Sequence, residues 1–127
     1  MSVWTFYDYV EPSGRVPFWD WFTALPEDVP PYIDARILVM RGLVTWSEKW
    51  ISSYRCAGKI FELRIPFNKV QYRPLGMYAP GRALIFLAGA IEKGGKLPTE
   101  TVKRAIDRQK LLWKEPDHVR LHRYYSD

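Results

Sequence analysis

Four basic residues in or just after expected strands are the side chains whose types and spacing most favour chemistry. Arg64 and Arg73 occur in two segments that alternate apolar and polar residues, and Lys93 and Lys96 follow a longer apolar segment. If these segments are neighbouring strands, the four cations form a positive pocket roughly 10 Å across. Such a pocket suits cleavage of an RNA backbone, because a guanidinium stabilises the charge that develops on the scissile phosphate.

The residues that would move protons in such a reaction are less clearly indicated. A lysine of lowered pKa, a tyrosine or a carboxylate could take the proton of the 2′-hydroxyl. His118 and His122 are four residues apart, which is metal-ligand spacing on a helix, but they lie in the C-terminal tail and far from the single cysteine. The sequence has neither an HExxH motif nor a glycine-rich loop that opens a helix. We therefore expect no metal and no cofactor.

A structural interpretation competes with the catalytic one for both arginines. Glu62 is two residues from Arg64, so the two side chains can share a strand face and form an ion pair. Arg73 could pair with the same glutamate across neighbouring strands. Spacing alone supports the catalytic and the structural interpretations equally.

The charge of the chain is divided unevenly along its length. Residues 1–54 hold four Lys and Arg against seven Asp and Glu, whereas residues 55–127 hold fifteen against seven. A basic half of this kind favours a polyanionic partner, most often nucleic acid, although a solvated basic face also promotes solubility. The further candidates for contacts with RNA or phosphate are Lys59, Tyr72, Arg104 and Arg108.

The aromatic residues divide into core candidates and stacking candidates. Trp4, Phe18, Trp21, Phe22 and Trp46 fall on apolar stripes, and we expect them in the core. In or near the basic half, the tyrosines that could stack on bases are Tyr72, Tyr78, Tyr124 and Tyr125.

Length and composition indicate a single domain over residues 1–127. The single cysteine excludes an internal disulfide, and the N-terminus lacks the charged and apolar regions of a secretory signal. The longest apolar run, Ala83–Ile91, is too short to span a membrane. We expect a cytoplasmic protein without membrane contact.

The pattern of hydrophobic residues predicts an α+β domain with an antiparallel sheet. An N-terminal strand, a two-helix hairpin, a three-strand meander and a C-terminal helix are expected in that order. The expected strands are 3–10, 59–65, 70–75 and 82–91, and the expected helices are 16–25, 31–45 and 98–114. The basic tail, residues 113–127, carries no pattern that assigns it a structure.

Several of these segments, taken in order, resemble the phage-derived, HigB-like toxins of the RelE/ParE superfamily. The matching pieces are the helix Phe18–Leu25, the strand Phe61–Ile65, Tyr72-Arg73, the strand that ends at Lys93, and Lys96-Leu97-Pro98 followed by Glu100, Ala105 and Arg108. They cover roughly residues 3–112. Two departures are Glu92, where many relatives carry a lysine, and the longer basic tail.

The resemblance implies a RelE-like fold and the toxin of a type II toxin–antitoxin system. It implies a metal-independent mRNA endonuclease that acts with the ribosome, with catalytic residues Arg64, Arg73 and Lys93, and with Lys96 near the phosphate. It also implies a helix-turn-helix antitoxin that supplies the sequence-specific DNA binding which the toxin alone lacks. The alternatives are a non-catalytic toxin that acts on DNA gyrase, as ParE does, and an inactive phage-derived module that binds RNA or protein.

Overall fold

A computed structural model describes residues 2–54 and 59–125. Three helices lie in this part of the chain: α1 (Pro17–Thr23), α2 (Val29–Arg41) and α3 (Thr99–Lys114). The strands are β1 (Thr5–Tyr9), β2 (Ile51–Tyr54), β3 (Ile60–Leu63), β4 (Ile65–Phe67), β5 (Val70–Ala79), β6 (Ala83–Glu92) and β7 (Val119–Leu121). No helix among the described residues is long and apolar enough to cross a bilayer.

The predicted α+β class is confirmed, but the sheet is mixed rather than antiparallel. Its strands follow the order β2-β3-β5-β6-β1-β7, and β4 pairs with β5 beside this path. β1 lies parallel to β6, from Thr5 opposite Ala83 to Asp8 opposite Phe86. The apolar pattern of β1 predicts a strand but does not specify its partner or the direction of the neighbouring strand.

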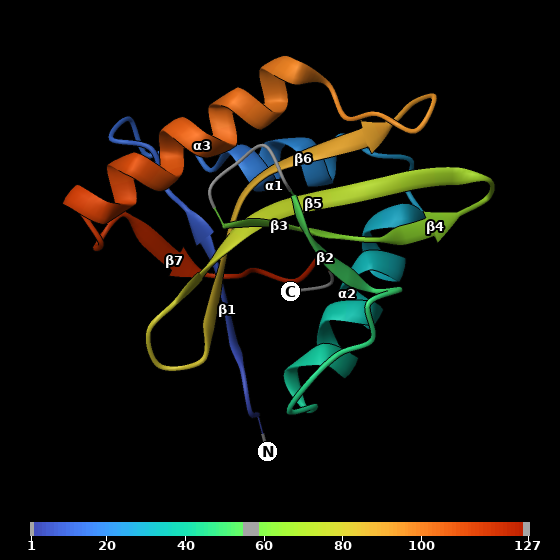
Figure 1. Cartoon of the computed structure of the whole chain (residues 1–127), viewed down its shortest axis with the longest axis horizontal. Helices are drawn as coiled ribbons and strands as arrows, with labels where there is room; N and C mark the ends of the chain where they lie inside the picture. The colour runs from blue at the N-terminus through green and yellow to red at the C-terminus, as the bar shows by residue number, and fades with distance from the viewer. Residues whose placement is uncertain (1, 55–58, 126–127) are drawn as a thin grey trace.

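Helices cover both faces of the sheet, as Figure 1 shows, with α3 on one side and α2 on the other. The core beneath α1 and α2 is rich in aromatic residues, and its fully buried members include Phe18, Phe22 and Phe86. The core beneath α3 is mainly aliphatic and includes Leu87, Val102 and Leu112. Alternation along β3 and β5 therefore sends successive side chains into different cores.

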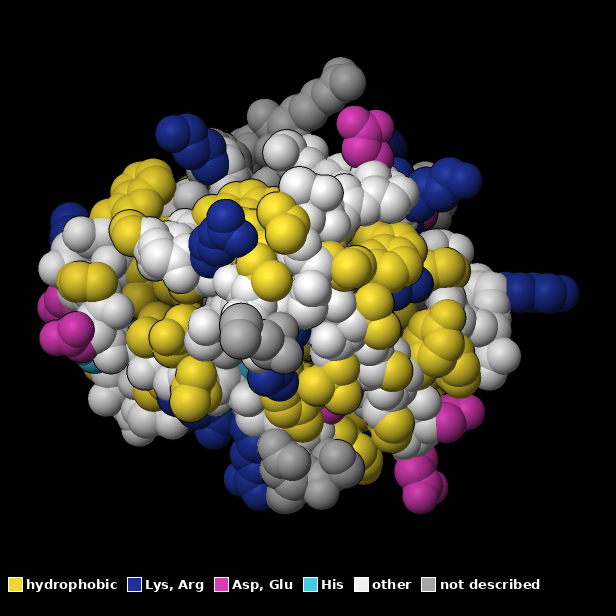
Figure 2. Space-filling model, turned by 90° about the horizontal axis from the view of Figure 1, so that it is seen from below, with side chains coloured by type: hydrophobic (Ala, Val, Ile, Leu, Met, Phe, Trp, Pro, Cys, Tyr) yellow, Lys and Arg dark blue, Asp and Glu magenta, His cyan; other side chains and the backbone are white. Residues whose placement is uncertain are grey.

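Helix α2 begins earlier and ends earlier than its sequence pattern predicts. Pro30 and Pro31 lie in its first turn, where backbone N–H groups have no partner within the helix, so neither proline breaks it. The helix ends at Arg41, before Gly42, rather than near Thr45. Its outward side carries exposed apolar residues, among them Leu38 and Val39. Figure 2 shows the molecule from below, and hydrophobic side chains are spread over much of the surface in that view.

Two short strands that the sequence pattern does not predict lie at the edges of the sheet. β2 pairs with β3 at one edge, and β7 pairs with β1 at the other. β7 belongs to the basic tail, and three residues are too few to produce a recognisable alternation. Its pairing to β1 fixes the tail against the N-terminal strand, from Tyr7 opposite Leu121 to Tyr9 opposite Val119.

Candidate functional site

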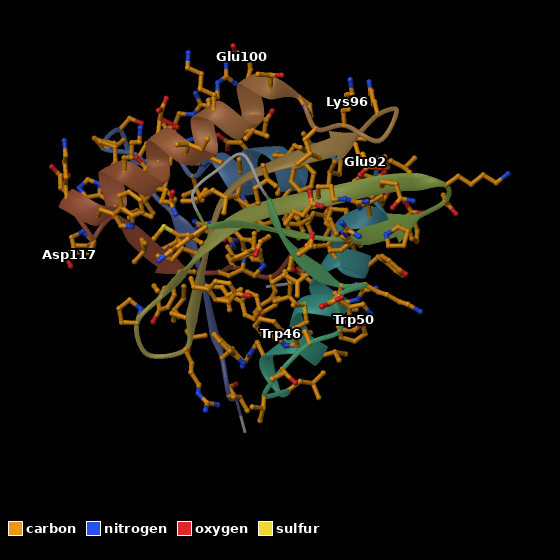
Figure 3. The ribbon with its side chains drawn as sticks, in the orientation of Figure 1. Trp46, Trp50, Glu92, Lys96, Glu100 and Asp117 are labelled. Atoms are coloured by element: carbon orange, nitrogen blue, oxygen red, sulfur yellow. The ribbon has the colours of Figure 1, made fainter. Side chains whose placement is uncertain are left out.

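A depression of about 420 Å³ lies where β3, β6 and the start of α3 meet. Figure 3 shows Glu92 and Lys96 at the same end of β6, beside the turn that leads into α3. The residues that line the depression are Glu62, Arg64, Glu92, Gly95, Lys96, Leu97 and Thr99. Two of the four basic residues expected in a shared pocket, Arg64 and Lys96, therefore do line one cavity.

The strand ends and a tight turn position these side chains. Glu62 lies in β3 opposite Leu75 of β5, and Arg64 is the residue between β3 and β4. After β6, Gly94 and Gly95 adopt φ angles of 58° and 74°, which suit glycine, and they reverse the chain. The reversal is closed by backbone hydrogen bonds between Lys93 and Lys96 in both directions. Lys96 is thereby returned over the end of the sheet.

Arg64 is available to a ligand while it also makes the ion pair expected of it. Its Nε lies 3.4 Å from Oε1 of Glu62, and the same carboxylate oxygen accepts a hydrogen bond from Ser52 at 3.3 Å. The side chain of Arg64 is 46% exposed, whereas that of Glu62 is 9% exposed. An ion pair at this exposure holds the guanidinium weakly, so it remains free to bind an anion.

Arg73 is almost buried and does not line the depression, so its predicted catalytic role stays a prediction. Its side chain is 7% exposed, and Nη2 lies 3.1 Å from Oε1 of Glu92. It also donates hydrogen bonds to the Gln71 side chain and to the Tyr72 carbonyl. The partner across the strands is thus Glu92 rather than Glu62. Gln71 lies directly opposite Glu92, and Arg73, two residues further along β5, reaches Glu92 diagonally.

Three other expected site residues lie outside the depression. Tyr72 is 4% exposed and packs in the core beneath α1 and α2, so its ring is not available for stacking on a base. Lys93 is exposed next to the depression but does not line it. Lys59 precedes β3, at the opposite end of that strand from Arg64. Strand alternation explains why Tyr72 is buried, since its side chain faces away from that of its neighbour Arg73.

Arg104 and Arg108 lie elsewhere, on α3. They line a second cavity, of about 520 Å³, together with residues of α1 and β6. Arg108 donates a hydrogen bond of 2.9 Å from Nη1 to the carbonyl of Leu87. Neither arginine forms an ion pair with a described residue within 4.0 Å, so both retain N–H groups for a ligand.

The carboxylates of the depression were not recognised as site residues from the sequence. Glu62 and Glu92 line it beside Arg64 and Lys96, so it combines two potential bases with two cations. From the sequence, Glu62 is predicted only as an ion-pair partner of the arginines, and Glu92 is only a departure from the lysine of many relatives. A signal was present, because each glutamate lies within four residues of a basic site residue at the end of a strand.

A separate buried network fixes the C-terminal segment. His122 lies between two aspartates, with Nδ1 2.9 Å from Asp8 and Nε2 3.0 Å from Asp34. Arg120 lies 3.6 Å from the other oxygen of Asp8, and the backbone N–H of Tyr125 donates to Asp34. The segment around His122 is a strand end rather than a helix, so its spacing from His118 does not place the two rings together.

The protonation of His122 makes this network sensitive to pH. Burial alone lowers the pKa of His122, but hydrogen bonds to Asp34 and Asp8, together with their charges, outweigh it and raise that pKa to about 9. A histidine pKa that is higher in the folded chain than its usual value of about 6.5 stabilises the fold fully below pH 6.5. This contribution is lost as pH rises through 9.

We expect the free energy of unfolding to fall by about 3 kcal/mol between pH 6.5 and pH 9.5, because each pKa unit corresponds to about 1.4 kcal/mol. Urea unfolding at several pH values would measure it. The variant His118→Ala should show the same fall, since His118 is on the surface beside Glu115. A stability that stays constant over this range would contradict the assignment of a charged His122.

Comparisons with known proteins do not assign the chain to a family. No family model, curated protein or solved structure matches it.

Proposed function

We propose that this protein is the toxin of a type II toxin–antitoxin system and that it cleaves mRNA on the ribosome, as the RelE-like toxins that it resembles do. The observation that carries the proposal is the shared depression, in which Arg64 and Lys96 lie beside Glu62 and Glu92. Cations for a phosphate and a carboxylate for a hydroxyl proton are the groups that RNA cleavage without a metal requires.

The chemistry can be assigned to individual side chains. Glu92, whose side chain is 25% exposed, takes the proton of the ribose 2′-hydroxyl. The 2′-oxygen then attacks the adjacent phosphorus, and the bond from phosphorus to the 5′-oxygen breaks. Arg64 stabilises the charge on the phosphate oxygens, and Lys96 gives a proton to the leaving 5′-oxygen. The products are a 2′,3′-cyclic phosphate and a 5′-hydroxyl, and water restores both protonation states.

Arg73 supports this scheme by holding the base. Its nearly buried guanidinium donates a hydrogen bond to one oxygen of Glu92. It also donates hydrogen bonds to the Gln71 side chain and the Tyr72 carbonyl. A carboxylate fixed in this way keeps its orientation when substrate enters. Arg73 is therefore a positioning residue in the proposed mechanism.

The proposed partners follow from the net charge of +5 and from the basic half of the chain. A basic toxin associates quickly with ribosomal and messenger RNA through phosphate contacts that are not specific for sequence. The proposed helix-turn-helix antitoxin covers the basic surface and adds specific binding to promoter DNA. The isolated chain then shows only salt-sensitive binding to nucleic acids.

Induction of the protein in growing bacteria tests the class of target. We expect protein synthesis to stop within minutes, transcripts to be cleaved within their coding regions, and plasmid supercoiling to remain unchanged. Inhibiting translation beforehand should protect the transcripts, because cleavage needs the ribosome. Intact transcripts with altered supercoiling would identify a gyrase toxin instead, and growth without either change would identify an inactive binding module.

A balanced charge in the depression is the observation that favours the gyrase alternative. Two glutamates offset Arg64 and Lys96, so the lining has less attraction for RNA than a purely basic pocket. The variant Glu92→Gln separates the two functions. It should abolish cleavage if Glu92 is the base, whereas a toxin that acts only by binding has no need of a carboxylate at this position.

A further inference from the structure

A second cavity lies around the edge of β6 that β1 leaves uncovered. β1 pairs with β6 only as far as Asp8 opposite Phe86, while β6 continues to Glu92. Beyond that point no strand among the described residues borders β6 on this side, and α1 and α3 approach its edge from the two faces of the sheet. The cavity of about 520 Å³ occupies this position, with Ala88 and Gly89 at its base.

Trp21 forms an apolar wall of this cavity because Gly89 has no side chain. A β-carbon at position 89 would overlap the six-membered ring of the indole, so the ring lies directly on the backbone of β6. Trp21 is only partly buried, and it lines the cavity as well as packing on the core. An aromatic wall of this kind accepts the flat face or edge of a nucleobase.

Three arginines line the same cavity. Arg15 is paired with Asp20 at 2.9 Å, but Arg104 is exposed and Arg108 is half buried, without an ion pair to a described residue within 4.0 Å. Burial lowers the pKa of Arg108. Glu11 and Tyr9 oppose this shift, whereas the positive charges of Arg104 and Arg15 add to it. An anion bound between Arg104 and Arg108 would relieve their repulsion.

Glu11 and Thr101 complete the lining with groups that suit a sugar rather than a second phosphate. The Glu11 carboxylate can accept a hydrogen bond from a ribose hydroxyl, and the Thr101 hydroxyl can donate or accept one. A second carboxylate, that of Asp20, is occupied by Arg15. The lining thus combines cations, an acceptor and an aromatic wall.

We propose that this cavity binds a phosphorylated nucleoside, with the phosphate on Arg104 and Arg108, the ribose near Glu11 and the base against Trp21. The site is separate from the depression around Arg64, so it does not depend on RNA cleavage there. A free nucleotide and one nucleotide of an RNA chain both offer a phosphate, a ribose and a base to this cavity. The titrations below distinguish the two.

Calorimetric titration of the purified chain with 5′-AMP tests the proposal. We expect binding that Arg104→Ala weakens at least tenfold and that Lys103→Ala and Lys110→Ala leave unchanged. Both control lysines are exposed on α3 outside the cavity, and each variant removes one positive charge, as Arg104→Ala does. Arg104→Gln should behave like Arg104→Ala, and Arg64→Ala should bind AMP normally, whatever its effect on cleavage.

Adenosine, inorganic phosphate and a 5′-phosphorylated ribotrinucleotide complete the experiment. Adenosine and phosphate should each bind at least tenfold more weakly than AMP. Tighter binding of the trinucleotide than of AMP would assign the site to an RNA chain, and equal binding would assign it to a free nucleotide. The proposal is overturned if AMP does not bind at millimolar concentration, if phosphate binds as well as AMP, or if Lys103→Ala weakens binding as much as Arg104→Ala.

Discussion

The variant Arg64→Ala is expected to cleave translated mRNA at least about a hundredfold more slowly than the natural chain, because it loses the cation that stabilises charge on the scissile phosphate. Its free energy of unfolding should change by less than about 1 kcal/mol, since the side chain is 46% exposed and its ion pair with Glu62 is long. Primer extension on an induced transcript measures cleavage, and urea unfolding measures stability.

Arg73→Ala provides the contrast with Arg64→Ala. Removing this buried guanidinium leaves Glu92 without its ion pair and Tyr72 without a hydrogen bond to its carbonyl, so we expect a loss of about 3 kcal/mol in stability. Lys103→Ala controls for net charge and should change neither quantity. A stable Arg64→Ala chain that cleaves mRNA at the natural rate would refute the proposed role of the depression.

The second large effect is expected at His122. Replacing it with alanine removes the imidazolium between the buried Asp8 and Asp34, and only Arg120, 3.6 Å from Asp8, and the Tyr125 N–H remain beside the two carboxylates. Breaking a buried ion pair by removing one partner costs about 3–5 kcal/mol. We therefore expect His122→Ala to unfold at a much lower urea concentration than the natural chain. The loss should be greater at pH 6.5 than at pH 9.5, where the natural histidine is largely neutral.

His118→Ala is the matched control for this effect. His118 lies 2.9 Å from Glu115 at the surface, and an exposed pair of this kind contributes at most about 1 kcal/mol. If His122→Ala were as stable as His118→Ala at pH 6.5, the buried network would not be what holds the C-terminal segment. Faster proteolysis of residues after Val119 in His122→Ala would identify release of that segment.

The sequence by itself determined the class of the fold and most of its elements, because hydrophobic periodicity is a local property of the chain. Phe61, Leu63 and Ile65 alternate with other residues along the sequence, and the structure places all three in one core. The same alternation accounts for the opposite directions of two neighbours in β5, since Tyr72 packs in the core beneath α1 and α2 whereas Arg73 pairs with Glu92. Local pattern also located Arg64 and Lys96 at strand ends, where the structure brings them to one depression.

Only the tertiary structure decided which side chains are buried together and which remain available. The parallel pairing of β1 with β6, and the addition of β7, join segments more than 70 residues apart, and no local pattern encodes such a pairing. These contacts bury His122, which the sequence places in a tail without an assigned structure. The pairing of β5 with β6 brings Arg73 to Glu92, whereas Arg64 remains partly exposed, because burial depends on neighbours that the folded chain supplies.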